Sequence, residues 1–148
     1  MNRVFREWLG NAFAYTHATM AKPHFKIDVA VQYLAHESSP QENLWGFAYT
    51  VTVTNAGDVA AQLIARHWVI DDSFGHRQEV RGLGVVGKQP YLQPGESFQY
   101  TSGTRIQSPM GSMHGTYFCI TEDAQPFEAT ISAFALKAEG EETERMLH

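Results

Sequence analysis

The sequence predicts an all-β protein that folds as an antiparallel β-sandwich of about seven or eight strands, with a closed barrel as the alternative. Three observations indicate this fold. From Phe25 onward, apolar residues recur at every second position, as a sheet with one buried face requires. Turn-forming Pro, Gly, Asn and Asp residues interrupt the pattern at intervals of about ten residues. Almost no helical spacing occurs between these turns.

The first strands are expected at residues 25–31, 47–53 and 62–70. A polar loop over residues 36–43 should separate the first two strands, since Pro40 blocks continuation of a strand. Residues 55–58 (NAGD) have the chemistry of a turn. In the strand 62–70, we expect Ile64, Trp68 and Ile70 to face one way.

The later strands follow from the same signals. Residues 71–75 (DDSFG) close a hairpin, and Pro94-Gly95 is a type II turn signal. Pro109 and Gly111 mark another loop. In the last strand the apolar positions change from odd to even around Ser132-Ala133, which predicts a β-bulge. These strands are expected at residues 77–80, 97–101, 116–121 and 127–136.

Length and composition limit the class of protein. The 148 residues suffice for one domain that needs no metal or disulfide support. Cys119 is the single cysteine, which favours a reducing, cytoplasmic location. No apolar run reaches the length of about eighteen residues that predicts a membrane span. The formal charge of −5 and the scattered bases give no basic face for nucleic acid.

The two ends of the chain differ from the predicted domain, which we place at residues 20–138. Glu7 and the lack of a cleavable apolar stretch argue against a signal peptide. The extension 1–19 is therefore interpreted as a helix that docks on the domain, or as the product of a start codon upstream of Met20. Residues 139–148 form an acidic, solvated tail. Apolar residues at helical spacing predict a short amphipathic helix in the extension: Val4, Phe5, Trp8, Leu9, Ala12 and Phe13.

The stretch 81–103 holds five of the twelve glycines and includes a G-x-G-x-x-G motif. This spacing matches dinucleotide-binding loops, but Pro90 and Pro94 leave no room for the helix that such a loop requires. A phosphate-binding P-loop also fails, because Gln89 stands where Ser or Thr would ligate magnesium. Two interpretations remain: a structural loop, or a concavity of backbone N–H groups that binds an anion. The candidate residues for the anion are Gly82, Gly84, Val85, Val86, Gly87, Lys88 and Gln89.

Other reactive side chains form no evident catalytic set, so we expect no enzyme activity and no cofactor. His67 and His76 flank the hairpin that carries Asp71 and Asp72, and these four residues are the candidate metal ligands. The alternative for them is ordinary turn chemistry. Cys119 has no neighbouring His or helix N-terminus that would lower its pKa, so a packing role is expected.

Several long motifs resemble the ApaG family, called CorD in some bacteria. They are FAYTVTV (47–53), RHW (66–68), GLGVVGKQP (82–90), PGESFQYTSG (94–103) and SPMGSMHGTY (108–117). The resemblance covers roughly residues 24–137. It implies an immunoglobulin-like or fibronectin type III-like sandwich. The chain departs from the family at Leu83, where an acidic residue is typical, and at Ser132, where proline is frequent.

The resemblance implies three hypotheses about function. The first is a non-enzymatic binding module with a protein partner, since related domains occur in eukaryotic F-box and polymerase-associated proteins. The second is a sensor that binds a pyrophosphate-containing nucleotide through the glycine-rich loop, because ApaG-like genes often accompany a diadenosine tetraphosphate hydrolase. The third is an accessory protein in cobalt and magnesium handling. Association of two copies of the chain into a homodimer is a further alternative.

Overall fold

The computed structural model describes residues 21–138, so the predicted extension and acidic tail lie outside the described residues. No helix in the described part is long and apolar enough to cross a membrane. The elements are β1 (Phe25–Ser39), η1 (Pro40–Glu42), β2 (Leu44–Asn55), β3 (Ala61–Asp72), β4 (Arg77–Leu83), β5 (Tyr91–Leu92), β6 (Ser97–Ile106), β7 (Met110–Thr121) and β8 (Pro126–Lys137).

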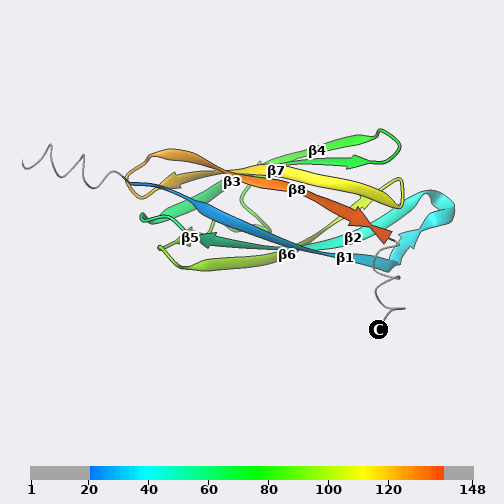
Figure 1. The fold of residues 1–148 in the computed structure, drawn as a ribbon, viewed down its shortest axis with the longest axis horizontal. Coiled ribbons are helices and arrows are strands. Elements are labelled where there is room, and N and C mark those ends of the chain that lie inside the picture. The colour runs from blue at the N-terminus through cyan, green and yellow to red at the C-terminus, as the bar shows by residue number, and fades with distance from the viewer. Residues whose placement is uncertain (1–20, 139–148) are drawn as a thin grey trace, which may run out of the picture.

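The strands form two antiparallel sheets, which Figure 1 shows as stacked layers. One sheet has the order β1-β2-β6. The other has the order β4-β3-β7-β8, with β5 paired to β3. On one side of the molecule β1 contacts β8, and the rings of Phe25 and Phe127 meet there edge to face at 5.4 Å. The predicted sandwich is confirmed, and because the sheets stay separate the barrel alternative is wrong.

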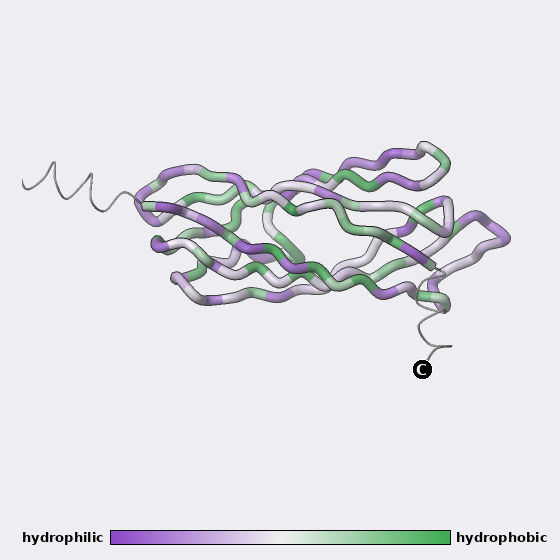
Figure 2. Tube along the Cα trace, viewed as in Figure 1, coloured by the Kyte–Doolittle hydropathy of each residue, from purple (hydrophilic) through white to green (hydrophobic). Residues whose placement is uncertain are grey.

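The core lies between the sheets because alternate residues of each strand point inward. Figure 2 shows hydrophobic segments recurring along the strands of both layers. Trp68 is 2% exposed and lies at the centre of the core. Its ring packs edge to face on Tyr49 at 5.3 Å, on Phe134 at 6.0 Å and on Tyr117 at 6.2 Å. Such aromatic pairs add stability beyond the area that they bury.

Two bulges adjust which residues face the core. In β8 the pair Gly115↔Ile131 is followed by Met113↔Phe134, so the extra residue falls at positions 132–133 and the predicted bulge is confirmed. The second bulge, at Ile64 in β3, was not predicted.

Because of the bulge at Ile64, the prediction that Ile64, Trp68 and Ile70 face the same way is wrong for Ile64. In a regular strand Ile64 and Trp68 would share a face. Instead Leu63 is fully buried, Ile64 is only partly buried, and the inward positions resume at residue 66.

Three further boundaries differ from the predictions. β1 continues through residues 36–39, where a polar loop was expected, because the Ser38 hydroxyl donates to the Leu34 carbonyl and accepts from the Gly46 N–H. β7 already begins at Met110, within the predicted loop. The short strand β5 was not predicted. The turn at Pro94-Gly95 is confirmed, with Gly95 at φ +88° and a hydrogen bond from Glu96 N to Gln93 O.

Candidate functional site

The glycine loop, residues 82–90, is a tight hairpin that closes β4. The N–H groups of Val85 and Lys88 each donate to the other's carbonyl, at 2.7 and 2.9 Å. The two residues between them, Val86 and Gly87, have φ of +44° and +79°, which is the signature of a type I′ turn. Positive φ suits glycine, but it is a genuine outlier for a β-branched residue such as Val86. The loop therefore holds backbone strain at its tip.

The Ile64 bulge anchors this loop to the sheet. The Ile64 carbonyl accepts hydrogen bonds from Gly84 N at 2.8 Å and from the Gln89 side chain at 3.0 Å. The end of the loop is held by a further hydrogen bond, from Leu63 N to Pro90 O at 3.0 Å. Bulges frequently re-aim a strand beside functional segments. Here the bulge turns a carbonyl toward the loop and fixes its position.

The structure explains why glycine is needed at each of the three glycine positions of the motif. A Cβ at Gly82 would lie 2.8 Å from Nη1 of Arg66, so this glycine makes room for a guanidinium. A Cβ at Gly84 would lie 2.4 Å from the Lys88 carbonyl oxygen, and its φ is +64°. Gly87 has open space around it and is required only for its positive φ. These three roles support the structural-loop interpretation of the motif.

The seven predicted anion-binding residues do form one continuous loop. However, the N–H groups of Gly84, Val85 and Lys88 are donated to carbonyls of the chain itself, and Val85 is fully buried. The Gln89 amide is bonded to Ile64. An anion would therefore depend on the remaining loop amides and on the exposed side chain of Lys88.

Apolar side chains gather on the outer face of the larger sheet beside the loop. The register aligns Leu83, Ala65 and Phe118 in one row across β4, β3 and β7. The next row brings Tyr91 and Ile120 to either side of Gln62. Leu83 is 74% exposed and Phe118 is 48% exposed. We call Ala65, Leu83, Tyr91, Phe118 and Ile120 the outer patch.

Part of the outer patch borders a shallow, open depression. A depression of about 340 Å³ lies along β3 and β4, with Leu83 and Phe118 among its lining residues. His67 and Arg81 also line it, so the apolar surface has a polar margin. Apolar patches rimmed by polar residues mark interaction sites in many proteins.

The four candidate metal ligands do not come together as one cluster. The Arg77 guanidinium donates to the Asp71 carboxylate at 2.7 and 3.0 Å, which holds the pKa of Asp71 below its ordinary value. His67 Nε2 instead lies 3.0 Å from Glu79 Oε1. Within residues 21–138, no group of three or more His, Cys, Asp or Glu side chains is arranged to hold a metal ion.

Asp72 and His76 do come together, with 2.6 Å between Oδ2 and Nδ1. Burial raises the pKa of Asp72, but hydrogen bonds from the N–H and ring of His76 and from the Phe74 N–H outweigh it, so the net direction is downward. The Asp72 carboxylate thus ties the hairpin together, as ordinary turn chemistry would. The predicted approach of His67 to His76 across the hairpin is not found.

Cys119 is 4% exposed and packs in the core on β7. Burial raises the pKa of its thiol to about 12. A thiol in this state is a poor nucleophile, in agreement with the predicted packing role.

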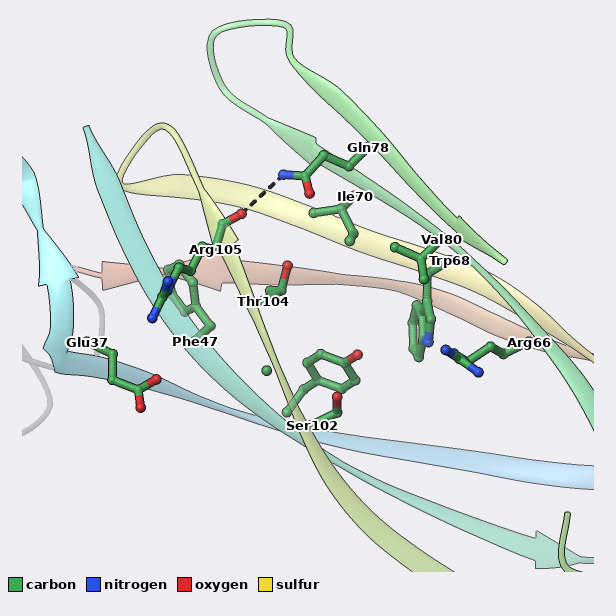
Figure 3. A pocket seen from close by; sticks show the side chains of 12 residues that line it. Glu37, Phe47, Arg66, Trp68, Ile70, Gln78, Val80, Ser102, Thr104 and Arg105 are labelled. Atoms are coloured by element: carbon green, nitrogen blue, oxygen red, sulfur yellow. Dashed lines mark hydrogen bonds between the residues drawn. The ribbon is translucent and has the colours of Figure 1, made fainter. Parts of the chain in front are cut away.

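The structure also has a cleft between the sheets, beside the edge strands β4 and β6. The sequence did not predict this cleft. The Gln78 side chain spans it and donates to the Arg105 carbonyl at 3.1 Å. We call this opening, of about 540 Å³, the interlayer cleft. In Figure 3, Arg66 and Trp68 lie toward one end and Phe47 and Arg105 toward the other. Only the inward alternation of β4 and β6 could have suggested which residues line it.

Comparison with known proteins assigns the family. Residues 35–121 match the model of the ApaG domain. Protein ApaG of Acidovorax sp. (strain JS42) is 56% identical over 121 residues, which cover 80% of this chain and 88% of that protein. Protein ApaG of Ralstonia nicotianae is 50% identical over 129 residues, which cover 87% of this chain and 100% of that protein.

A solved structure agrees with this assignment. The crystal structure of a Bordetella pertussis protein described as ApaA is 48% identical in sequence and superposes with a TM-score of 0.76. The match covers 78% of this chain and 94% of that chain. The predicted resemblance is confirmed, and the chain belongs to the ApaG domain family.

Proposed function

We propose that this chain is a non-enzymatic binding module of the cytoplasm, which recognises a protein partner through the glycine loop and the outer patch. The observation that carries this proposal is the strained and exposed Val86. Its side chain is 55% exposed at the loop tip, yet its φ is +44°. Strained residues persist where the surroundings fix them, and they cluster at functional sites.

The surroundings of Val86 supply this fixation. The hairpin bonds between Val85 and Lys88 and the anchors on Ile64 hold the loop backbone on the sheet. A binding surface presented by a fixed backbone loses little entropy when a partner docks. The strain at Val86 is therefore consistent with a side chain kept for contact rather than for folding.

The outer patch supplies the contact area beside the loop. Leu83, Tyr91 and Phe118 are large apolar side chains, each about half or more exposed, on the strands β4, β5 and β7 that pair with β3. Aromatic residues are enriched in the cores of protein interfaces, and charged residues are depleted there. The patch fits a partner with a complementary apolar surface better than it fits a nucleotide.

The proposal can be tested by capture on the immobilised full-length chain from a lysate of the organism that encodes it. Leu83→Ser and Phe118→Ser should abolish retention of the partner while leaving the fold intact, because both side chains are exposed. Phe74→Ser is the matched control, since Phe74 is 66% exposed at the hairpin beyond the other end of β4. Equal retention by all variants would contradict the proposal.

The nucleotide-sensor hypothesis is decided by a separate titration. Pyrophosphate and ADP are added to the isotope-labelled protein, and its backbone amides are followed by NMR. Localised shifts at residues 82–90 would favour the sensor. Their absence at millimolar concentration would leave the protein-binding module.

A further inference from the structure

We infer that the interlayer cleft binds a small organic monoanion with a flat apolar body, such as an aromatic carboxylate. The cleft opens between the sheets, whereas the outer patch covers the outer face of one sheet, and Arg66 lines both the cleft and the depression at the patch. The inference does not rest on the proposed protein partner. Three observations support it: the orientation and charge of Arg66, the side chains that line the cleft, and the net charge of that lining.

Arg66 is held in a fixed orientation by the end of β4. Its Nη1 donates to the Leu83 carbonyl at 2.9 Å and to the Gly84 carbonyl at 3.0 Å, and the guanidinium lies against Gly82. A guanidinium carries five N–H donors in a rigid fork. Two carbonyl contacts through one nitrogen orient this fork and leave its other nitrogens for a ligand.

No carboxylate within residues 21–138 neutralises the charge of Arg66. Its side chain is only partly exposed. A partly buried charge without a partner is costly, and the strongest partners of guanidinium are carboxylates and phosphates bound by two parallel hydrogen bonds. Arg66 is therefore the anion-binding group of the cleft.

The walls of the cleft suit a flat ring. Phe47, Tyr49 and Trp68 line the cleft with small exposed parts of largely buried rings. Ser102 and Thr104 contribute hydroxyl groups from β6. Figure 3 shows the ring of Trp68 beside Arg66. The volume of about 540 Å³ lies within the range of about 300–1,000 Å³ typical of small-molecule sites. The lining mixes aromatic rings with hydroxyl, amide and charged groups, so a ligand that has both an apolar body and a charged group can use it.

The charges around the cleft select a monoanion. Arg66, Arg105 and Glu37 are the charged residues that line it, and they leave one net positive charge. A carboxylate balances this charge. A phosphate dianion would add a negative charge that no lining group neutralises, and a cation would be repelled.

The test compares two ligands of nearly the same shape, one an anion and the other neutral. 1-Naphthaleneacetate and its neutral amide, 1-naphthaleneacetamide, are titrated separately into the isotope-labelled full chain, and the spectra are recorded by amide NMR. We expect both ligands to shift the Trp68 indole N–H and the amides of residues 102–104. The carboxylate should bind at least about tenfold more tightly, as expected for a charge-assisted bidentate contact.

Variants assign that preference to one side chain. Arg66→Gln should abolish the difference between acid and amide, whereas Lys26→Gln, at an exposed position of β1 outside the cleft, should change the affinity for the acid by less than about threefold. Equal affinities of the wild-type protein for acid and amide would overturn the inference, even if Arg66→Gln fails to fold. Shifts confined to the outer patch, or no binding by about 10 mM, would overturn it as well.

Discussion

Replacing Val86 by asparagine should stabilise the protein, although most single substitutions destabilise. An L-residue in the left-handed region costs about 1–2 kcal/mol, and asparagine tolerates that region because its side chain bonds locally. The variant also creates Asn-Gly, the preferred pair for a type I′ turn. Val86 is 55% exposed, so less than half of the roughly 1.5–3 kcal/mol for a fully buried aliphatic side chain is lost. We therefore expect a net gain of about 0.5–1 kcal/mol.

Thermal unfolding followed by circular dichroism measures this effect. For a domain of this size the gain corresponds to a rise in Tm of about 1–4 °C. Val86→Ala is the control, because alanine loses the valine contacts but keeps the unfavourable φ, and it should not raise Tm. A Tm for Val86→Asn at or below that of the wild type would show that the loop tip is not strained.

The remaining predictions concern the glycine loop and the core. Gly84→Ala should destabilise by about 2–4 kcal/mol, through a clash with backbone and positive φ, and Gly87→Ala by only about 1 kcal/mol, as denaturant midpoints would show. Reversal of this order would refute the assigned roles. Lys88→Glu should leave Tm unchanged and, if the loop binds pyrophosphate, weaken that binding at least about tenfold; unchanged affinity by calorimetry would exclude the loop as the anion site. Burial raises the pKa of Tyr100 to about 12 and also raises the pKa of Tyr117, and the two hydroxyls are hydrogen-bonded to each other. The neutral phenols therefore stabilise the fold fully below the unfolded pKa of about 10, and this stability is lost as the pH rises toward about 12. In the double variant Tyr100→Phe, Tyr117→Phe, the free energy of unfolding measured with urea should change less between about pH 10 and 12 than in the wild type. An unaltered pH dependence would contradict this account.

Local patterns predicted the elements whose causes are local. The alternation in 47–53 reflects one buried face, and the bulge at Ser132-Ala133 follows from a change of apolar parity that can be read from the residues themselves. The turn at Pro94-Gly95 follows from the φ preferences of two residues. In each case a few neighbouring residues carry the whole signal.

The features that escaped prediction depend on distant residues. The bulge at Ile64 is held by donors from Gly84 and Gln89, twenty and more residues later in the chain. β5 is only two residues long and exists through its pairing with β3. The interlayer cleft requires β4 and β6 to lie across from each other, which the topology decides and no local pattern reveals.

The sequence predicted a special loop at residues 82–90 but not what its glycines accommodate. The G-x-G-x-x-G motif drew attention to residues 82–90, where the loop and the exposed Val86 lie. Its glycines, however, accommodate Arg66, a backbone carbonyl and a tight turn. The importance of Arg66 could not be read from the sequence, because its guanidinium is oriented by carbonyls seventeen and eighteen residues away.

The most direct test of the proposed function is an NMR map of the captured partner on the isotope-labelled chain. Amide and methyl signals are recorded with and without the purified partner, at a concentration that saturates binding. Perturbations should concentrate at Leu83, Val86, Tyr91, Phe118 and Ile120, and Phe118→Ser should remove them. Perturbations confined to the β1-β2-β6 sheet would contradict the account, because they would place recognition on the opposite layer.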